Sequence, residues 1–284
     1  MKIVYKPIKW EKEILRIKKV NRELDPSDIH AINHHNLKMT IKMYVNADTI
    51  PEDHYPIKDA VSFYDMLGSR YNLLADEIYL LENDVDSFAG NLYLYILAKS
   101  KAYEFKASGT KITNQSIEYN HSKKRGLEQI SFSAVTINKF ELFEKFADGT
   151  GCELIKAMYH KDYDKARRLA EQLPDTAEMY KKDKYRETYY FDKRYMKDLY
   201  LSILDKNEKA FNEALMTRIK NVRKGYIMPV DVVSTAMIKF ASENGISYNF
   251  DVIEIPRKLI NGEITIDTDK YKFPDFSEYK GEIL

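Results

Sequence analysis

Cysteine is nearly absent from this sequence, and so is any long run of apolar residues. The 284 residues include one cysteine, Cys152, which excludes an intramolecular disulfide and a zinc site built from several cysteines. Taken alone, Cys152 is interpreted as a small buried side chain near a helix start. No stretch reaches the roughly 18 apolar residues of a membrane span, and the N-terminal segment lacks the apolar centre of a signal peptide. We therefore expect a cytoplasmic protein with no membrane partner.

An excess of either charge is also lacking. Lys and Arg total 45, Asp and Glu total 44, and the formal net charge is +1. General nucleic-acid binders carry a basic excess, because phosphate contacts supply most of their affinity. We therefore expect no nucleic-acid partner. With 44% hydrophobic and 31% charged residues, the composition is that of a globular protein.

Recognisable catalytic motifs are missing as well. The sequence contains no P-loop, Gly-x-Gly-x-x-Gly, Gly-x-Ser-x-Gly or kinase signature. The acidic pair Asp162 and Asp164 is expected to begin a helix, where a carboxylate interacts favourably with the helix dipole, and not to act as an acid/base pair. We expect a protein that is not an enzyme, with no catalytic residue and no cofactor.

The one metal-like grouping is "HAINHH", which contains His30, His34 and His35. His30 and His34 are four residues apart and would share one helix face, as zinc ligands on helices do. The Glu that follows the first His in the helical metalloprotease motif is missing. Nearby carboxylates are Asp25, Asp28 and Asp53. A chance grouping is the simpler interpretation, and a metal-dependent enzyme stays open as an alternative that metal analysis would test.

Apolar residues recur every three or four positions through most of the chain, which predicts a mainly α protein. Amphipathic patterns cover residues 59–82 and 85–105, and helical pairs follow from about 150. Similar polar turns separate helices in "YLLENDVDSF", "AMYHKDYDKA" and "SILDKNEKAF". Their spacing is irregular, so we expect an irregular bundle of antiparallel helical hairpins and not a repeat array of fixed period.

One region breaks the helical pattern. Residues 103–135 contain short alternating runs with Gly109 and Gly126 as breakers, which fit one or two short strands or a long surface loop. We expect a small β element there, within a single helical domain over residues 1–284. The predicted parts of this domain are an N-terminal helical arm (1–55), a helical-hairpin core (56–260) and an irregular tail (261–284).

The segment "YKKDKYRETYYFDKRYMKDLY", from Tyr180 to Tyr200, combines tyrosines with basic residues. Its simplest interpretation is a long helix with half-buried tyrosines, whose acids pair with nearby bases. The functional interpretation is a contact with a protein partner, because Tyr and Arg are enriched among the residues that dominate binding energy. The partner-binding residues predicted on this basis are Tyr185, Tyr189, Tyr190 and Arg194.

The C-terminal half carries a longer pattern. "YLSILDKNEKAFNEAL" is followed by "MPVDVVSTAMIKFASENGISYNFDVIEIPRKLI", that is, a helical pair, an Asp-containing helix, a Gly stop and an extended acidic stretch that ends in Pro and Leu. In this order, residues 150–260 resemble the C-terminal region of bacterial polymorphic-toxin immunity proteins of the immunity-protein-49 type. The matching positions are Asp231, Gly245, Asp251 and Pro256.

The resemblance implies a non-enzymatic immunity protein whose partner is a cognate bacterial toxin. Neutralisation would follow from occlusion of the toxin's active site, or from locking of its fold, by a preformed surface. A helical-repeat-like scaffold that binds peptides or regulates transcription is the alternative. A regular groove between hairpins would favour this scaffold, and the irregular spacing of the turns counts against it.

Overall fold

A computed structural model describes residues 8–124, 126–175, 195–225, 229–249, 252 and 254–282. Within these residues the chain forms helices and no strand, which confirms the prediction of a mainly α fold. The α-helices are α1 (Ile8–Leu24), α2 (Ala31–Val45), α3 (Ala60–Glu82), α4 (Val85–Ala107), α5 (Gln115–Ser122), α6 (Leu127–Thr136), α7 (Thr150–Tyr159), α8 (Tyr163–Glu171), α10 (Met196–Leu204), α11 (Glu208–Gly225), α12 (Val232–Glu243) and α13 (Arg257–Ile260). The 3-10 turns are η1 (Glu52–His54), η2 (Phe140–Leu142), η3 (Glu144–Phe146) and η5 (Phe276–Tyr279).

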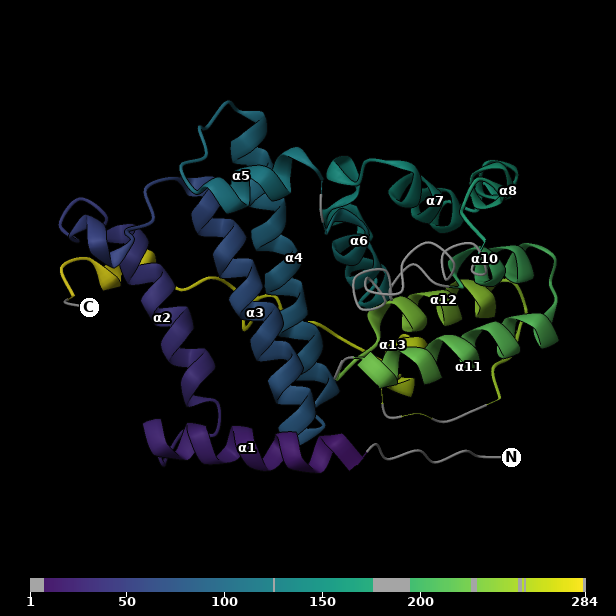
Figure 1. Ribbon diagram of the computed structural model, residues 1–284, viewed down its shortest axis with the longest axis horizontal. Coiled ribbons are helices and arrows are strands. Elements are labelled where there is room, and N and C mark those ends of the chain that lie inside the picture. The colour runs from purple at the N-terminus through teal and green to yellow at the C-terminus, as the bar shows by residue number, and fades with distance from the viewer. Residues whose placement is uncertain are drawn as a thin grey trace.

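The helices form two groups that lie side by side (Figure 1). In the first group α3 and α4 pack as a long antiparallel pair, α2 packs on α3, and α1 lies across one end of these helices. In the second group α7 packs on α8, α8 on α10, and α10 on α11. α6 contacts α4, α7 and α12 and so connects the groups. Most of the buried apolar side chains accordingly form one cluster that runs from Ile41 to Leu259.

Three turns between consecutive helices share one local geometry. Each contains a residue in the left-handed conformation, followed directly by an Asp or Asn that caps the next helix. The left-handed residues are Asn83 (φ 57°), Lys161 (φ 60°) and Lys206 (φ 53°). The capping residues are Asp84, Asp162 and Asn207, whose side-chain oxygens accept hydrogen bonds from backbone N–H groups two or three residues later. The similarity of the three polar turns is therefore structural, as their sequences predict.

The small β element expected over residues 103–135 is wrong for the described part of that region. α4 continues to Ala107, and α5 and α6 follow it. Between α4 and α5, the backbone N–H and the hydroxyl of Thr113 both donate to the Asp59 carboxylate, at 2.9 and 2.6 Å, so this loop is tied to a side chain and not to a strand. α6 is buried among α4, α7 and α12, and its sequence alternates apolar and small polar residues in "ISFSA", which is the pattern of a strand and misled the prediction.

Residues 261–282 make no α-helix, yet they pack on the rest of the protein. The segment passes α4 and α3 and ends beside α2, where η5 contacts that helix (Figure 1). Four of its aromatic side chains are partly buried against the apolar core: Tyr271, Phe273, Phe276 and Tyr279. The end of the chain is thereby fixed to its N-terminal helices.

Candidate functional site

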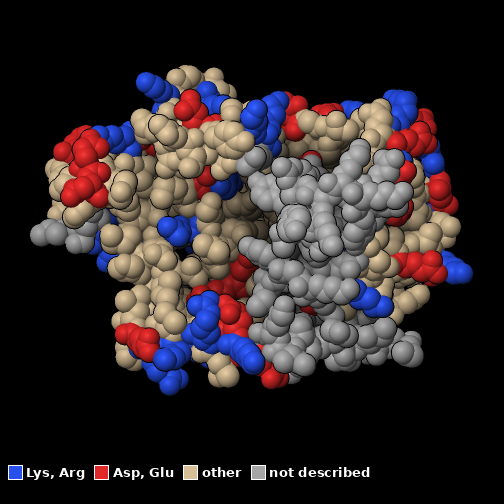
Figure 2. Space-filling view, in the orientation of Figure 1, with Lys and Arg blue, Asp and Glu red and all other residues tan. Residues whose placement is uncertain are grey.

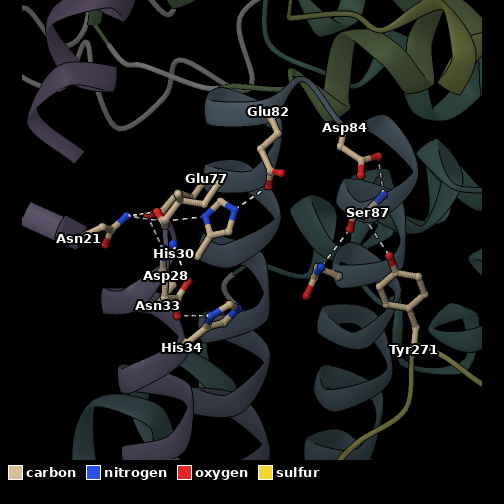
Figure 3. A network of polar contacts seen from close by, with 12 residues as sticks. Asn21, Asp28, His30, Asn33, His34, Glu77, Glu82, Asp84, Ser87 and Tyr271 are labelled. Atoms are coloured by element: carbon tan, nitrogen blue, oxygen red, sulfur yellow. Dashed lines mark hydrogen bonds and ion pairs between the residues drawn. The ribbon is translucent and has the colours of Figure 1, made fainter. Parts of the chain in front are cut away.

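A buried polar network joins α1, α2 and α3 (Figure 3). His30, directly before α2, is 6% exposed, and its ring lies between two carboxylates of α3. Its Nδ1 is 2.9 Å from Glu77 Oε1, and its Nε2 is 2.6 Å from Glu82 Oε1. The side-chain amides of Asn21 in α1 and Asn33 in α2 donate to the two oxygens of Glu77, at 2.9 and 2.6 Å. The network therefore holds the first two helices on the third.

The two partners of His30 determine its charge. A carboxylate only accepts hydrogen bonds, so both ring nitrogens donate, which requires the protonated imidazolium. Burial by itself would lower the pKa of His30. The hydrogen bonds and charges of Glu77 and Glu82 outweigh burial and hold this pKa above its ordinary value of 6.5. The positive charge compensates buried negative charge, and the cluster is an ion-pair network.

This arrangement differs from the metal site that the "HAINHH" motif suggests. A metal ion requires an unprotonated ring nitrogen, and both nitrogens of His30 are occupied by carboxylates of α3. His34 and His35 are exposed, and His34 Nδ1 lies 2.7 Å from Asp28 Oδ2 instead of sharing a ligand set with His30 (Figure 3). Across the part of the chain that the structure places, no three His, Cys, Asp or Glu side chains are arranged to hold a metal ion.

Two other reactive side chains are buried in structural roles. Cys152 is 1% exposed, and burial raises the pKa of its thiol to about 11, so the thiol is protonated at neutral pH and is a poor nucleophile. Burial also lowers the pKa of Lys239 to about 8. Lys239 Nζ donates to the carbonyl oxygens of Val135 and Thr136 and to Asn138 Oδ1, at 3.2, 2.6 and 2.6 Å. Lys239 thereby caps the C-terminal end of α6, where a cation is favourable.

A second polar cluster holds α5 on α3 and α4. Asp65 Oδ1 lies 2.9 Å from Lys99 Nζ and 3.0 Å from His121 Nε2, and Lys99 also donates to Ser69 Oγ at 3.1 Å. Burial opposes ionisation of Asp65, but His121 and Lys99 outweigh burial and lower the pKa of this carboxyl group. Asp65 is therefore an ionised anchor for two helices.

An open groove of about 660 Å³ runs along the exposed face of α11. It is lined by Glu208, Lys209, Asn212, Glu213, Met216, Thr217, Lys220 and Asn249. The lining includes two acids and two lysines, so the charges balance. Among the placed side chains, Lys209, Glu213 and Lys220 take part in no ion pair. The groove thus presents charged groups of both signs that are available to a partner.

Among the described lining residues, Asn249 alone lies outside α11, and it belongs to a segment that α11 holds by its backbone. Asn212 Nδ2 donates to the carbonyl of Ser247 at 2.9 Å, and Asn212 Oδ1 accepts from the N–H of Asn249 at 3.2 Å. Glu208 Oε2 accepts from the N–H of Ser247 at 3.1 Å. Because hydrogen bonds hold this segment on α11, the groove is preformed.

The described residues of the sequence resemblance lie at the ends of α12 and α13. Asp231 caps α12 by accepting from the Ser234 N–H at 3.0 Å, and it lies 3.3 Å from the guanidinium of Arg218 in α11, which is 0% exposed. Gly245, with φ 77°, follows the end of α12, and Pro256 directly precedes α13. Asp231 therefore links α11 to α12 through Arg218, and Gly245 and Pro256 mark the end of α12 and the start of α13.

Five predicted positions lie outside the described residues: Tyr185, Tyr189, Tyr190, Arg194 and Asp251. The expected contact of the tyrosine-rich segment with a partner stays a prediction. The sequence reasoning also missed the groove, although a signal was present. Glu208, Asn212 and Lys220 lie at multiples of four residues and form a polar stripe along one face of α11, with Met216 as its apolar member.

No protein-family model matches this chain, and no curated protein or solved structure gives a significant match to it. None of the helices in the described ranges is long and apolar enough to cross a membrane. Figure 2 shows acidic and basic side chains interspersed over the described part of one face. A functional conclusion therefore depends on the geometry of the sites and on the sequence resemblance.

Proposed function

We propose that this chain is a non-enzymatic binding protein of the immunity class, which neutralises a cognate protein toxin by covering its working surface. The observation that carries the proposal is the groove along α11. It is open and preformed, and it belongs to the part of the chain, residues 150–260, that resembles immunity proteins. A preformed surface binds with little structural change, which suits rapid and tight neutralisation.

The state of four buried, chemically capable side chains in the described part of the protein favours binding over catalysis. His30 is protonated between two carboxylates, and the Cys152 thiol is buried and protonated. Lys239 and Asp65 are used to hold helices together. A general base or a nucleophile has to reach a substrate in an accessible site, and these four side chains do not meet that requirement.

The charges of the groove indicate the kind of partner. Glu208 and Glu213 alternate with Lys209 and Lys220 along one helix face, which complements a protein surface of mixed charge better than a polyanion. A stable interface buries roughly 800 Å² on each partner, so the groove would be the centre of a larger contact. The tyrosine-rich segment before α10 is the predicted extension of that contact.

The test is capture of the partner by the tagged chain from the cells in which it occurs, followed by expression of the captured protein. A groove variant, Lys209→Glu with Lys220→Glu, is compared with a control of equal charge change on the exposed side of α1, Lys12→Glu with Lys18→Glu. We expect the partner to arrest growth when expressed alone and the chain to relieve the arrest. The groove variant should bind at least tenfold more weakly, a loss of about 1.4 kcal/mol, and the control should bind normally.

Two results would contradict the proposal. A partner that is harmless when expressed alone is not a toxin, and the immunity function then fails. A toxin that binds the groove variant and the parent chain equally shows that the contact lies elsewhere on the protein.

A scaffold that binds peptides is the second candidate, and one observation favours it. The hairpins α7–α8 and α10–α11 stack consecutively, with α8 against α10, as neighbouring hairpins do in helical-repeat proteins. Capture of several proteins that share a short peptide, none of them toxic, would support this scaffold.

A further inference from the structure

The C-terminal residues 271–282, here called the strap, occupy an aromatic groove formed by α2, α3 and α4. The ring of Phe273 lies with its centroid 6.0 Å from that of Tyr64 and 5.9 Å from that of Tyr71. The ring of Phe276 meets Phe63 edge-on at 5.1 Å. Phe63 is 0% exposed and Tyr71 is 4% exposed, so the strap lies on aromatic side chains that belong to the core.

Gly90 in α4 has no side chain and so leaves the space that the ring of Tyr271 occupies. A Cβ atom placed on Gly90 would lie 2.2–2.4 Å from three atoms of the Tyr271 ring, a distance that real contacts do not allow. The Tyr271 hydroxyl also lies 3.3 Å from Ser87 Oγ, one turn earlier in the same helix (Figure 3). Gly90 therefore admits this ring at a position where a larger residue would have to displace it.

Asn46, at the end of α2, binds the backbone of the strap. Asn46 Nδ2 donates to the carbonyl of Tyr279 at 3.0 Å, and Asn46 Oδ1 accepts from the N–H of Gly281 at 2.7 Å. Asn212 binds the backbone of residues 247 and 249 in the same way: it donates to the carbonyl of Ser247 and accepts from the N–H of Asn249. Lys42 Nζ adds an ion pair with Glu282 at 3.0 Å.

The strap lies at the surface, and its departure would uncover the core aromatic side chains beneath it. Every residue from 271 to 282 is at least partly exposed, whereas the side chains beneath it include fully buried ones. The residues before it, 267–270, are all exposed and form a turn in which Asp267 Oδ1 accepts from the N–H groups of Asp269 and Lys270, at 3.0 and 3.2 Å. This turn consists of polar residues, and none of its side chains is buried.

We propose that the aromatic groove is a docking site for the strap of a second copy of this chain, so that two chains exchange straps and form a dimer. The occupant follows from the fit. The groove contacts the strap through specific residues: Gly90, the aromatic rings of α3, Asn46 and Lys42. A second copy of the chain carries the same strap and the same groove. Exchange of an identical element between copies creates a dimer from contacts that already exist in the monomer.

Concentration decides which strap fills the groove. A strap that is covalently joined to its own chain meets its own groove at an effective concentration in the millimolar range. At micromolar protein the chain's own strap therefore prevails, and exchange increases as the protein is concentrated or as the strap of the same chain is disabled. This inference does not depend on the function proposed for the α11 groove.

The test mixes two full-length variants with complementary defects. The groove-blocked chain carries Gly90→Leu and Lys42→Glu and keeps a normal strap. The strap-blocked chain carries Phe273→Ser and Phe276→Ser and keeps a normal groove. We expect each to be monomeric alone and the mixture to form a one-to-one heterodimer, measured by sedimentation velocity and by native mass spectrometry with one chain isotope-labelled. In the control experiment, a chain with Lys272→Ser and Glu278→Ser takes the place of the strap-blocked chain. These substitutions alter only exposed strap residues, so this chain keeps its own strap in its groove and should form no heterodimer.

A peptide-binding measurement distinguishes a loss of binding from a loss of folding in either variant. A fluorescent peptide of residues 267–284 should bind the strap-blocked chain and should bind the groove-blocked chain at least tenfold more weakly, with far-UV circular dichroism confirming that both are helical. A mixture that stays monomeric overturns the proposal, even if the peptide binds. Absence of peptide binding to a helical strap-blocked chain overturns it as well.

Discussion

The role of His30 is decided at the residue scale by neighbours that are distant in the sequence. Its two carboxylate partners, Glu77 and Glu82, follow it by 47 and 52 residues. A histidine four residues before another histidine is compatible with a metal site, but the surroundings of the ring make it a cation. The sequence motif pointed to His30 as a residue of interest, and the fold determined that its ring is a cation and not a metal ligand.

Replacement of His30 by Gln should destabilise the protein by about 2 kcal/mol at pH 6, because hydrogen bonds to charged groups are lost in a buried network. The effect should decrease as the pH rises. The folded-state pKa of His30 is raised above 6.5, so its stabilising contribution is complete below pH 6.5 and is lost as the pH rises through the folded-state pKa. Urea unfolding of both proteins between pH 6 and pH 8 measures the difference in the free energy of unfolding.

The matched control for this prediction is His34→Gln, since His34 also lies beside a carboxylate but is exposed. An exposed ion pair contributes roughly 0–1 kcal/mol, so this variant should lose much less stability. A constant difference between the His30 variant and the parent protein across this pH range would show that the imidazolium is not the form that stabilises the network.

At the scale of elements, the caps between helices determine where each hairpin turns. Lys161 and Lys206 adopt left-handed φ values although they are not glycines, and the Asp or Asn that follows each of them begins the next helix. The positions of these turns were predictable, because capping depends on side chains within three residues of the backbone groups that they satisfy. The helical conformation of α5 and α6 was not predictable from the sequence. α6, for example, is buried by contacts with α4, α7 and α12, which no local pattern shows.

The cap of α8 gives a prediction at this scale. Asp162→Ala should lower the free energy of unfolding by about 1 kcal/mol, because the hydrogen bond from the Lys165 N–H to the cap is lost. Asp164→Ala, inside the first turn of the same helix, removes only a favourable charge near the helix start and should cost about 0.3–0.5 kcal/mol. Thermal and chemical unfolding of the two variants compares them directly, and equal losses would contradict a capping role.

At the scale of the whole molecule, one apolar cluster connects the two groups of helices. α6 lies between them, and the strap returns from α13 to α2, at the opposite side of the structure in Figure 1. Long-range contacts of this kind favour a single cooperative unit, as the predicted single domain over residues 1–284 requires.

We therefore expect one unfolding transition. In urea, the loss of helix measured by far-UV circular dichroism and the loss of tertiary packing measured by near-UV circular dichroism should have the same midpoint. Both groups of helices contain tyrosines, so the near-UV signal reports on each of them. Two separated transitions would show that the groups unfold independently and that the chain contains two domains.

The sequence by itself determined the helical class, the hairpin turns and the capping residues, because these depend on periodicity and on side chains close to each other in the chain. Only the tertiary structure decided the partners of His30, the groove along α11 and the place of the strap. Each of these depends on contacts between residues tens to hundreds of positions apart, such as Asn46 with Tyr279. No local pattern of polar and apolar residues encodes which of many compatible surfaces will meet, because that choice follows from the packing of the whole core.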